Sequence, residues 1–126
     1  MNCKMTGIIL AGGKNYRMGL NKALLKIGGA TIIERLVEAI RPIFSEVILV
    51  TNSPDDFKFL SPRSVRDVVS IRASLVGLYS GLIHSNTYQN FFFACDMAFI
   101  KADLVEFMTN QSLGYDVTIP RGQDGL

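Results

Sequence analysis

The chain has 126 residues, of which 48% are hydrophobic and 19% are charged, and its formal net charge is +2. This length suits one compact domain, so we expect residues 1–126 to form a single domain. The small net charge argues against a general nucleic-acid binder, and no apolar run approaches the roughly 18 residues that a membrane span needs. Two widely spaced cysteines form no metal or redox motif, so we expect a reduced, cytoplasmic setting.

The first predicted elements are a strand, an extended segment and a helix. Met5–Leu10 is an apolar run of strand length, and Ala23–Ile27 is a short extended piece that ends at Gly28-Gly29. Thr31-Ile32-Ile33-Glu34 forms a capping box, which marks the start of a helix. The predicted inward stripe of this helix, which runs until Pro42, consists of Ile33, Leu36, Val37 and Ile40.

The middle of the chain continues this alternation. Glu46–Thr51 contains four consecutive aliphatic residues and is predicted to be a second buried strand. Asn52-Ser53-Pro54 is predicted to turn, and a short helix follows at Asp55–Phe59. The third predicted strand covers Val65–Val69.

Ser74 is predicted to cap the next helix. The only histidine, His84, falls at the end of this helix, where we assign it a structural role. Gly77 and Gly81 lie four residues apart, and we expect them to let the helix approach the sheet closely. The predicted inward stripe consists of Leu75, Leu78, Tyr79 and Leu82.

The last predicted elements are a strand at Phe91–Cys95, a helix at Lys101–Asn110 and a fifth strand that opens at Asp116–Ile119. The inward residues of that helix are predicted to be Leu104, Phe107 and Met108. The chain then ends in a turn-like segment, residues 120–126, without a closing helix. Either the sequence is a fragment that lacks the C-terminal part of the fold, or another chain completes the sheet.

Continuous apolar strands that alternate with amphipathic helices are typical of a parallel sheet covered on both faces. We therefore predict an α/β fold with three layers, in which a Rossmann-like, mostly parallel sheet lies between helices. In such sheets, ligands bind beyond the carboxyl ends of the strands.

The first predicted strand opens into a loop rich in glycines and cations. Gly12 and Gly13 allow backbone N–H groups to approach a ligand with no Cβ in the way. Lys14, Arg17 and Lys22 supply positive charge, and residues 1–26 contain no acidic residue. The sequence therefore predicts a loop that binds an anionic phosphate chain. The alternative for the two glycines is a tight turn without a ligand.

This loop matches neither of the two commonest phosphate motifs, because it lacks the P-loop Ser/Thr and the dinucleotide glycine spacing. The pattern that it does carry, Leu-Ala-Gly-Gly-x3-Arg-Met-Gly-x2-Lys from Leu10 to Lys22, resembles the signature of the nucleotidyltransferases. Its Leu-Ala-Gly-Gly form is similar to that of the molybdenum cofactor guanylyltransferases, and the resemblance runs through nearly the whole chain. It implies a fold of the nucleotide-diphospho-sugar transferase type.

Three further segments fit the resemblance. Phe93-Ala94-Cys95-Asp96-Met97 resembles the metal-aspartate motif of the family, which implies Mg²⁺ on Asp96. Asn52 and Asp67 fall where the family has the asparagine and aspartate that fix the nucleoside. Each has a plainer alternative: a turn residue or helix cap for Asp96, a turn residue for Asn52 and an exposed strand residue for Asp67. Cys95 is interpreted as a buried apolar filler.

The resemblance implies a Mg²⁺-dependent transfer of GMP from GTP to a molybdopterin-type cofactor, with release of pyrophosphate. The backbone N–H groups of Ala11 to Gly13 would hold the phosphates, Arg17 would clamp the β- and γ-phosphates, and Lys22 would stabilise charge on the α-phosphate. The implied catalytic residues are Arg17, Lys22 and Asp96. The implied nucleotide-binding residues are Leu10, Ala11, Gly12, Gly13, Lys22, Asn52, Asp67 and Asp96.

The implied partners are GTP, the molybdopterin-type cofactor and molybdenum cofactor assembly proteins, with neither nucleic acid nor membrane. Two alternatives stay within the fold: a molybdopterin cytidylyltransferase and a sugar-phosphate nucleotidyltransferase. Gly12 favours guanine, because cytidylyl relatives often carry alanine at this position. A third alternative, from another class, is a nucleotide-binding module without turnover. Lys22 has its own plain alternative, an exposed surface lysine.

Overall fold

The computed structural model describes residues 3–11, 16–17, 20–21, 24, 26–51, 57–60, 62–65, 74–95, 97 and 100–120. Three helices and eight short or medium strands lie in these ranges. In chain order they are β1 (Cys3–Leu10), β2 (Tyr16–Arg17), β3 (Leu20–Asn21), β4 (Lys26–Ile27), β5 (Ala30–Thr31), α1 (Ile32–Ile40), β6 (Phe44–Val50), β7 (Arg63–Val65), α2 (Ser74–His84), β8 (Gln89–Ala94) and α3 (Ala102–Gln111).

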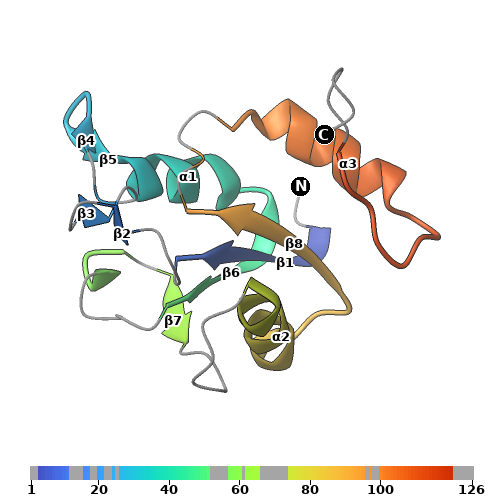
Figure 1. Ribbon diagram of the computed structural model, residues 1–126. Helices are drawn as coiled ribbons and strands as arrows, with labels where there is room; N and C mark the ends of the chain where they lie inside the picture. Colours follow the sequence, from blue (N-terminus) through green and yellow to red (C-terminus); the bar gives the residue numbers. More distant parts are fainter. Residues whose placement is uncertain are drawn as a thin grey trace.

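Four strands form a parallel sheet in the order β7-β6-β1-β8, and helices cover both of its faces (Figure 1). This confirms the predicted α/β class. The chain passes outward from β1 through β6 to β7, and it then returns through α2 to place β8 on the other side of β1. The direction of strand addition therefore reverses between β1 and β8, which is the switch point where open α/β sheets bind ligands.

One face of the sheet packs against α1 and α3. The predicted stripe of α1 is confirmed, since Ile33, Leu36, Val37 and Ile40 are all buried in the cluster on this face. Three aromatic rings from β6 and β8 fill its centre: the centroids of Phe91 and Phe93 lie 4.7 Å apart, and the ring of Phe44 lies 5.9 and 5.8 Å from them. Burial of these large side chains is the main stabilising contribution of this layer.

The other face packs against α2, and here the predicted stripe is wrong in part. Tyr79 and Leu82 are 54% and 49% exposed, whereas Ser80 and Gly81 are buried. The reason is a close approach of helix and sheet: a Cβ on Gly81 would lie 2.7 Å from Cγ2 of Ile8. Small residues therefore form the inner face, as predicted for Gly81. His84 has a structural contact, because its Nδ1 lies 2.8 Å from the carbonyl oxygen of Ser80.

The inward residues predicted for α3 are also wrong in part. Leu104 and Phe107 are 46% and 60% exposed, Met108 is half-buried, and the buried residues are Val105 and Thr109. Each residue advances about 100° around a helix, so the true inward face is rotated by one position from the predicted one. The helix itself begins and ends within one residue of the prediction.

The remaining strand and helix predictions hold only in part. β7 begins at Arg63 rather than Val65, and residues 66–69 lie outside the described part of the chain. Of the predicted helix Asp55–Phe59, a single turn is described, closed by the bond from the Leu60 N–H to the Phe57 carbonyl oxygen at 3.1 Å. Asp116–Ile119 forms no strand in this structure; its side chains are exposed, and no described strand pairs with it.

Candidate functional site

The carboxyl ends of the four parallel strands are aligned. Leu10, the last residue of β1, has Val50 as its register partner on β6 and Ala94 as its register partner on β8. Val50 in turn pairs with Val65, the last residue of β7. All four strands therefore end at one level, and the segments that follow them leave the sheet side by side.

Backbone hydrogen bonds extend this alignment one residue beyond the strands. The N–H of Ala11 donates to the Val50 carbonyl oxygen at 2.8 Å, and the N–H of Thr51 donates to the Val65 carbonyl oxygen at 2.9 Å. Ala11 and Thr51 are buried. The Ala11 N–H is thus bonded to β6 and is not the phosphate donor that the sequence analysis expects. The bond instead fixes the direction in which the glycine loop leaves β1.

Most of the predicted site residues lie outside the described residues, but their sequence positions share a feature. Each of four of them stands two positions after the last residue of a strand in the sheet: Gly12 after Leu10, Asn52 after Val50, Asp67 after Val65 and Asp96 after Ala94. Gly13 and Lys22 also lie outside the described part, whereas Leu10 and Ala11 are described there. Cys95 is buried, as predicted.

A small hairpin connects the segments that carry Arg17 and Lys22. Strands β2 and β3 are antiparallel, with Tyr16 opposite Asn21 and Arg17 opposite Leu20. Arg17 is thereby placed in the backbone of β2, and Lys22 follows directly after the last residue of β3. Of the two cations in the predicted signature, Arg17 therefore belongs to one strand of this hairpin, and Lys22 is the next residue after the other strand.

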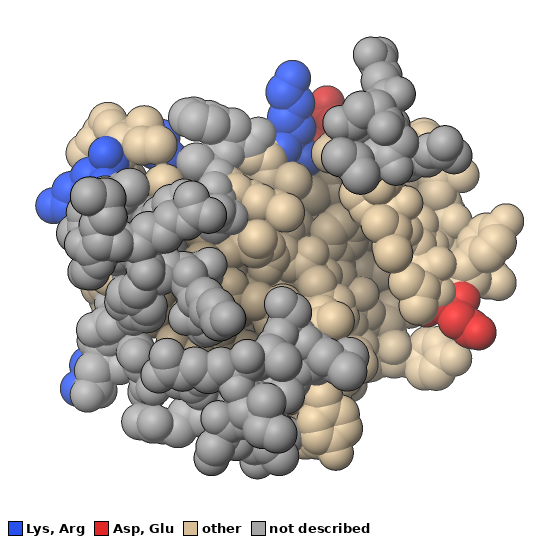
Figure 2. Space-filling view, viewed as in Figure 1, with Lys and Arg blue, Asp and Glu red and all other residues tan. Residues whose placement is uncertain are grey.

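A second hairpin, β4–β5, follows and leads into α1. Its turn is Gly28-Gly29, with φ angles of 63° and 89°, a region that glycine adopts without the strain imposed by a Cβ. Figure 1 shows both hairpins at the end of the molecule toward which the arrows of β1 and β8 point. In the same view of the surface, basic side chains lie over the β4–β5 end of the described part, and near the start of α3 a basic side chain lies beside an acidic one (Figure 2).

The predicted capping box at the start of α1 is confirmed. The Thr31 N–H and hydroxyl donate to Glu34 Oε1, each at 2.9 Å, and the Glu34 N–H donates to Thr31 Oγ1 at 3.2 Å. The bond from the Thr31 backbone, followed by that from its hydroxyl, lowers the pKa of Glu34 below its ordinary value, and the charge of Lys26 acts in the same direction. The N-terminus of α1 is thus fixed directly after β5.

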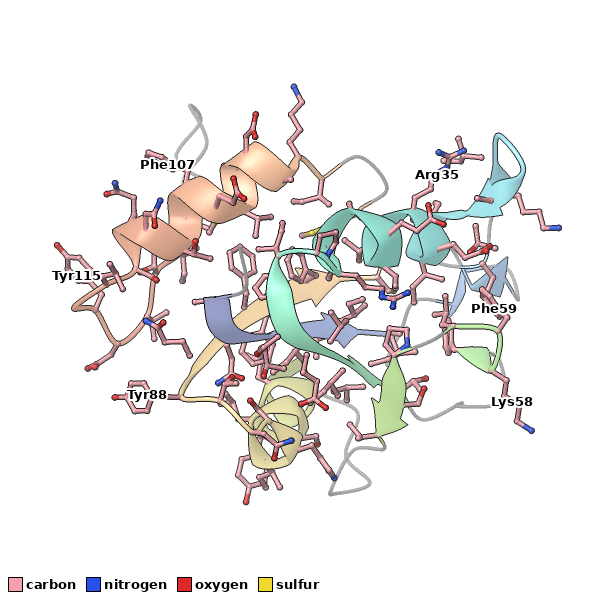
Figure 3. The ribbon with its side chains drawn as sticks, turned by 180° about the vertical axis from the view of Figure 1, so that it is seen from behind. Arg35, Lys58, Phe59, Tyr88, Phe107 and Tyr115 are labelled. Carbon is pink, nitrogen blue, oxygen red and sulfur yellow. The ribbon has the colours of Figure 1, made fainter. Side chains whose placement is uncertain are left out.

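One contact at this end of the molecule was missed by the sequence analysis. The guanidinium of Arg35, one turn into α1, donates from Nε to the carbonyl oxygen of Ile27 at 2.8 Å, and its Nη2 contacts the same oxygen. Figure 3 shows Arg35 at the same end of the molecule as Lys58 and Phe59, and far from Tyr115. Because the acceptor is a backbone carbonyl, the sequence holds no motif that could have identified the pair.

The described residues contain no group of three or more His, Cys, Asp and Glu side chains arranged to hold a metal ion. None of the helices described there combines the length and apolar character that a bilayer span requires.

Comparison with known proteins identifies a family. Residues 7–126 match the family described as "MobA-like NTP transferase domain". A probable molybdenum cofactor guanylyltransferase of Pelotomaculum thermopropionicum is 38% identical over 92% of this chain and 57% of its own length. One of Carboxydothermus hydrogenoformans is 40% identical over 91% of this chain and 58% of its own length. The chain thus spans somewhat more than half the length of these curated relatives.

A solved structure shares the fold. The molybdopterin-guanine dinucleotide biosynthesis protein A of Archaeoglobus fulgidus superimposes with a TM-score of 0.71 and is 22% identical. The match covers 94% of this chain and 62% of that one. At this identity the likeness shows the fold alone.

Proposed function

We propose that this chain, which belongs to the MobA-like NTP transferase domain family, carries the nucleotide site of an enzyme that transfers GMP from GTP to a molybdopterin-type cofactor. In this reaction a phosphate oxygen of the acceptor forms a bond to the α-phosphorus of GTP. The bond between the α-phosphorus and the α–β bridging oxygen breaks, and pyrophosphate leaves. We propose residues 1–126 as one nucleotidyltransferase domain.

One observation carries the proposal. The aligned strand ends Leu10, Val50, Val65 and Ala94 are each followed, two positions later, by a residue of the predicted site. This edge of the sheet is where α/β folds bind ligands. The placement of Gly12, Asn52, Asp67 and Asp96 after four neighbouring strands supports the functional interpretation, and the variants below separate it from the turn, cap and exposed-strand alternatives.

The roles of the residues follow from the charge of the substrate. Backbone N–H groups of Gly12 and Gly13, which follow the anchored Ala11, bind the triphosphate. Arg17 holds the β- and γ-phosphates with its planar guanidinium, and Lys22 stabilises the charge that grows on the α-phosphate as the bridging bond breaks. Asn52 and Asp67 fix the nucleoside. Positioning and charge neutralisation supply most of the catalysis, because phosphoryl-type transfer demands little covalent chemistry from the protein.

Asp96 fits a magnesium ion by its donor chemistry. It follows the end of β8, and the glycine loop follows the end of the adjacent β1, so a carboxylate and the substrate phosphates meet at one strand pair. Mg²⁺ in nucleotide sites is bound by one or two carboxylates together with phosphate oxygens and waters, so a cluster of three protein ligands is not required. When bound, the ion neutralises phosphate charge at the reacting centre.

Release of pyrophosphate tests this proposal. The chain is incubated with GTP, MgCl₂ and molybdopterin-type cofactor, and the Carboxydothermus hydrogenoformans relative serves as the positive control in the same assay. We expect release with GTP and little with CTP. Lys22→Ala and Asp96→Ala should each lower the rate about 10²–10³-fold, as does removal of a group that stabilises transition-state charge.

Two kinds of result would replace this proposal with one of the alternative functions. Release that depends on CTP, or on a sugar phosphate as acceptor, would establish a cytidylyltransferase or a sugar-phosphate nucleotidyltransferase instead. Tight binding of GTP without release of pyrophosphate, while the relative is active, would establish the alternative without turnover.

A further inference from the structure

We propose that Arg35 is a positioning residue for the phosphate site, because it holds the β4–β5 hairpin and thereby the segment that carries Lys22. This inference rests on the proposed function of Lys22. Arg35 itself touches neither substrate nor metal in the proposal. Its effect passes through the backbone of Ile27.

The first step is that the hairpin needs an anchor. Strands β4 and β5 have two residues each, and they pair only with one another among the described strands. An isolated hairpin of this size is not stable in water. The capping box fixes its C-terminal arm to α1 through Thr31, but the N-terminal arm, which lies toward Lys22, has no part in that box.

Arg35 supplies the anchor for the N-terminal arm. Its Nε and Nη2 both reach the carbonyl oxygen of Ile27, eight residues earlier in the chain. The guanidinium also fills the space above the turn, since a Cβ on Gly28 would lie 2.6 Å from Nη2. Arginine suits this task better than lysine, because its planar group presents two donors in a fixed geometry to one acceptor.

Residues on both sides of Lys22 in the sequence are held by contacts. On the N-terminal side, Asn21 is paired with Tyr16 in the β2–β3 hairpin. On the C-terminal side, Leu24 packs against the core on the α1 face, and Ile27 is held by Arg35. In the sequence, Lys22 thus lies between the two hairpins, and the Arg35 contact is one of the contacts made by the described residues that flank it.

A double-mutant cycle tests whether Arg35 acts through Lys22. The affinity for GTP in the presence of MgCl₂ is measured for wild type, Arg35→Ala, Lys22→Ala and the double variant. We expect Arg35→Ala to weaken GTP binding about tenfold, the loss of roughly one strong hydrogen bond. In the Lys22→Ala background the same change should have no further effect, because the group that it positions is gone.

Two variants serve as controls. Arg41→Ala removes the same charge from the exposed C-terminal end of α1 and should leave GTP affinity unchanged. Arg35→Lys retains one donor for the Ile27 carbonyl and should restore most of the affinity. Hydrogen exchange without nucleotide adds a readout of the contact itself: amides of residues 26–31 should exchange faster in Arg35→Ala, while those of β1 should not.

The possible failures can be told apart. Additive effects of Arg35→Ala and Lys22→Ala, or unchanged GTP affinity in Arg35→Ala when the wild type binds normally, would overturn this inference and leave the proposed function intact. Absence of GTP binding by the wild type would overturn the proposed function, and with it the role of Arg35 in positioning Lys22.

Discussion

Leu10 and Ala94 are register partners at the last positions of two neighbouring parallel strands. The glycine loop follows Leu10 directly, and Asp96 stands two residues beyond Ala94. Any change that shifts β8 against β1 therefore alters the relation between the loop and the carboxylate. The packing of α2 against these two strands therefore offers the first test of how they are held together.

Gly81→Ala should destabilise the protein although alanine is the better helix former. The added methyl group would meet Ile8 at 2.7 Å and Phe92 at 3.4 Å, and these two residues are register partners on β1 and β8. We expect a net loss of about 1–3 kcal/mol, the usual cost of overpacking. The matched change Leu82→Ala on the half-exposed side should cost less than about 1 kcal/mol. Urea denaturation of both variants gives the comparison, and an equal or larger loss in Leu82→Ala would refute the described orientation of α2.

The face that α3 turns toward the sheet can be tested in the same way. Val105 is fully buried and Phe107 is 60% exposed. Val105→Ala should therefore lower the free energy of unfolding by about 2 kcal/mol, through two lost methyl groups and the cavity that they leave. Phe107→Ala, although it removes a larger side chain, should cost less than half as much. The reverse order in thermal or urea unfolding would restore the orientation predicted from the sequence.

The capping box predicts a pH-dependent stability. Because the pKa of Glu34 is lowered in the folded protein, its contribution is present above the pKa of the unfolded chain and disappears as the pH falls through the folded pKa. The difference in stability between wild type and Glu34→Gln should therefore be larger at about pH 7 than at about pH 3. Thr31→Ala should cost about 1 kcal/mol at neutral pH. A wild-type-to-Gln difference that stays constant over this range would argue against the charged bond.

The two glycines of the β4–β5 turn should respond differently to alanine. Both have positive φ, so each substitution should cost about 1–2 kcal/mol of backbone strain. A Cβ on Gly28 also meets the Arg35 guanidinium, whereas a Cβ on Gly29 meets nothing within 4 Å. The guanidinium is the end of a flexible side chain and can move aside, so Gly28→Ala should be the more destabilising of the two only by the lost bond to Ile27, about 1 kcal/mol or less, and Arg35→Ala should remove this difference. Equal effects in the presence of Arg35 would be evidence against the contact.

The elements with strong local signals were predictable from the sequence. In α1, the capping box of Thr31 and Glu34 defines the start, and a single clear apolar stripe defines the buried face. Strands β1 and β6 contain the continuous apolar runs Ile8–Leu10 and Val47–Val50, because both faces of the sheet are covered there. In these elements the local sequence pattern agrees with the burial that the fold imposes, so the pattern alone was sufficient to predict them.

The orientation of α2 and α3 was not predictable in the same way. Helix α2 carries apolar residues around most of its circumference, so periodicity alone does not select a face. Helix α3 has an apolar side, but its buried residues, Val105 and Thr109, lie at the edge of that side. The inner face of α2 depends on how closely Gly81 can approach Ile8, which is a property of the sheet rather than of the helix. The segment Asp116–Ile119 has a strand-like sequence, but a strand also needs a partner, and no described strand pairs with it.

Some residues of the candidate site could likewise be predicted from the sequence, and others could not. The glycine loop and Asp96 were found because their residue types form short motifs that directly follow apolar strands. Arg35 was not found, because its partner is the carbonyl oxygen of Ile27, which any residue type would offer at that position. Contacts to backbone groups leave no pattern in the sequence and require the structure.

Magnesium-dependent binding of GTP is the sharpest test of a triphosphate site that the glycine loop and Asp96 share. The affinity of wild type and of Asp96→Asn, which preserves the shape of the side chain and removes its charge, is measured with MgCl₂ and with EDTA. We expect magnesium to strengthen GTP binding to the wild type. Asp96→Asn should lose most of this increase, while its metal-free binding should be equal or tighter, because a carboxylate repels the triphosphate when no cation lies between them. An equal magnesium effect in both proteins, or no binding of GTP by the wild type, would contradict a triphosphate site shared by the glycine loop and Asp96.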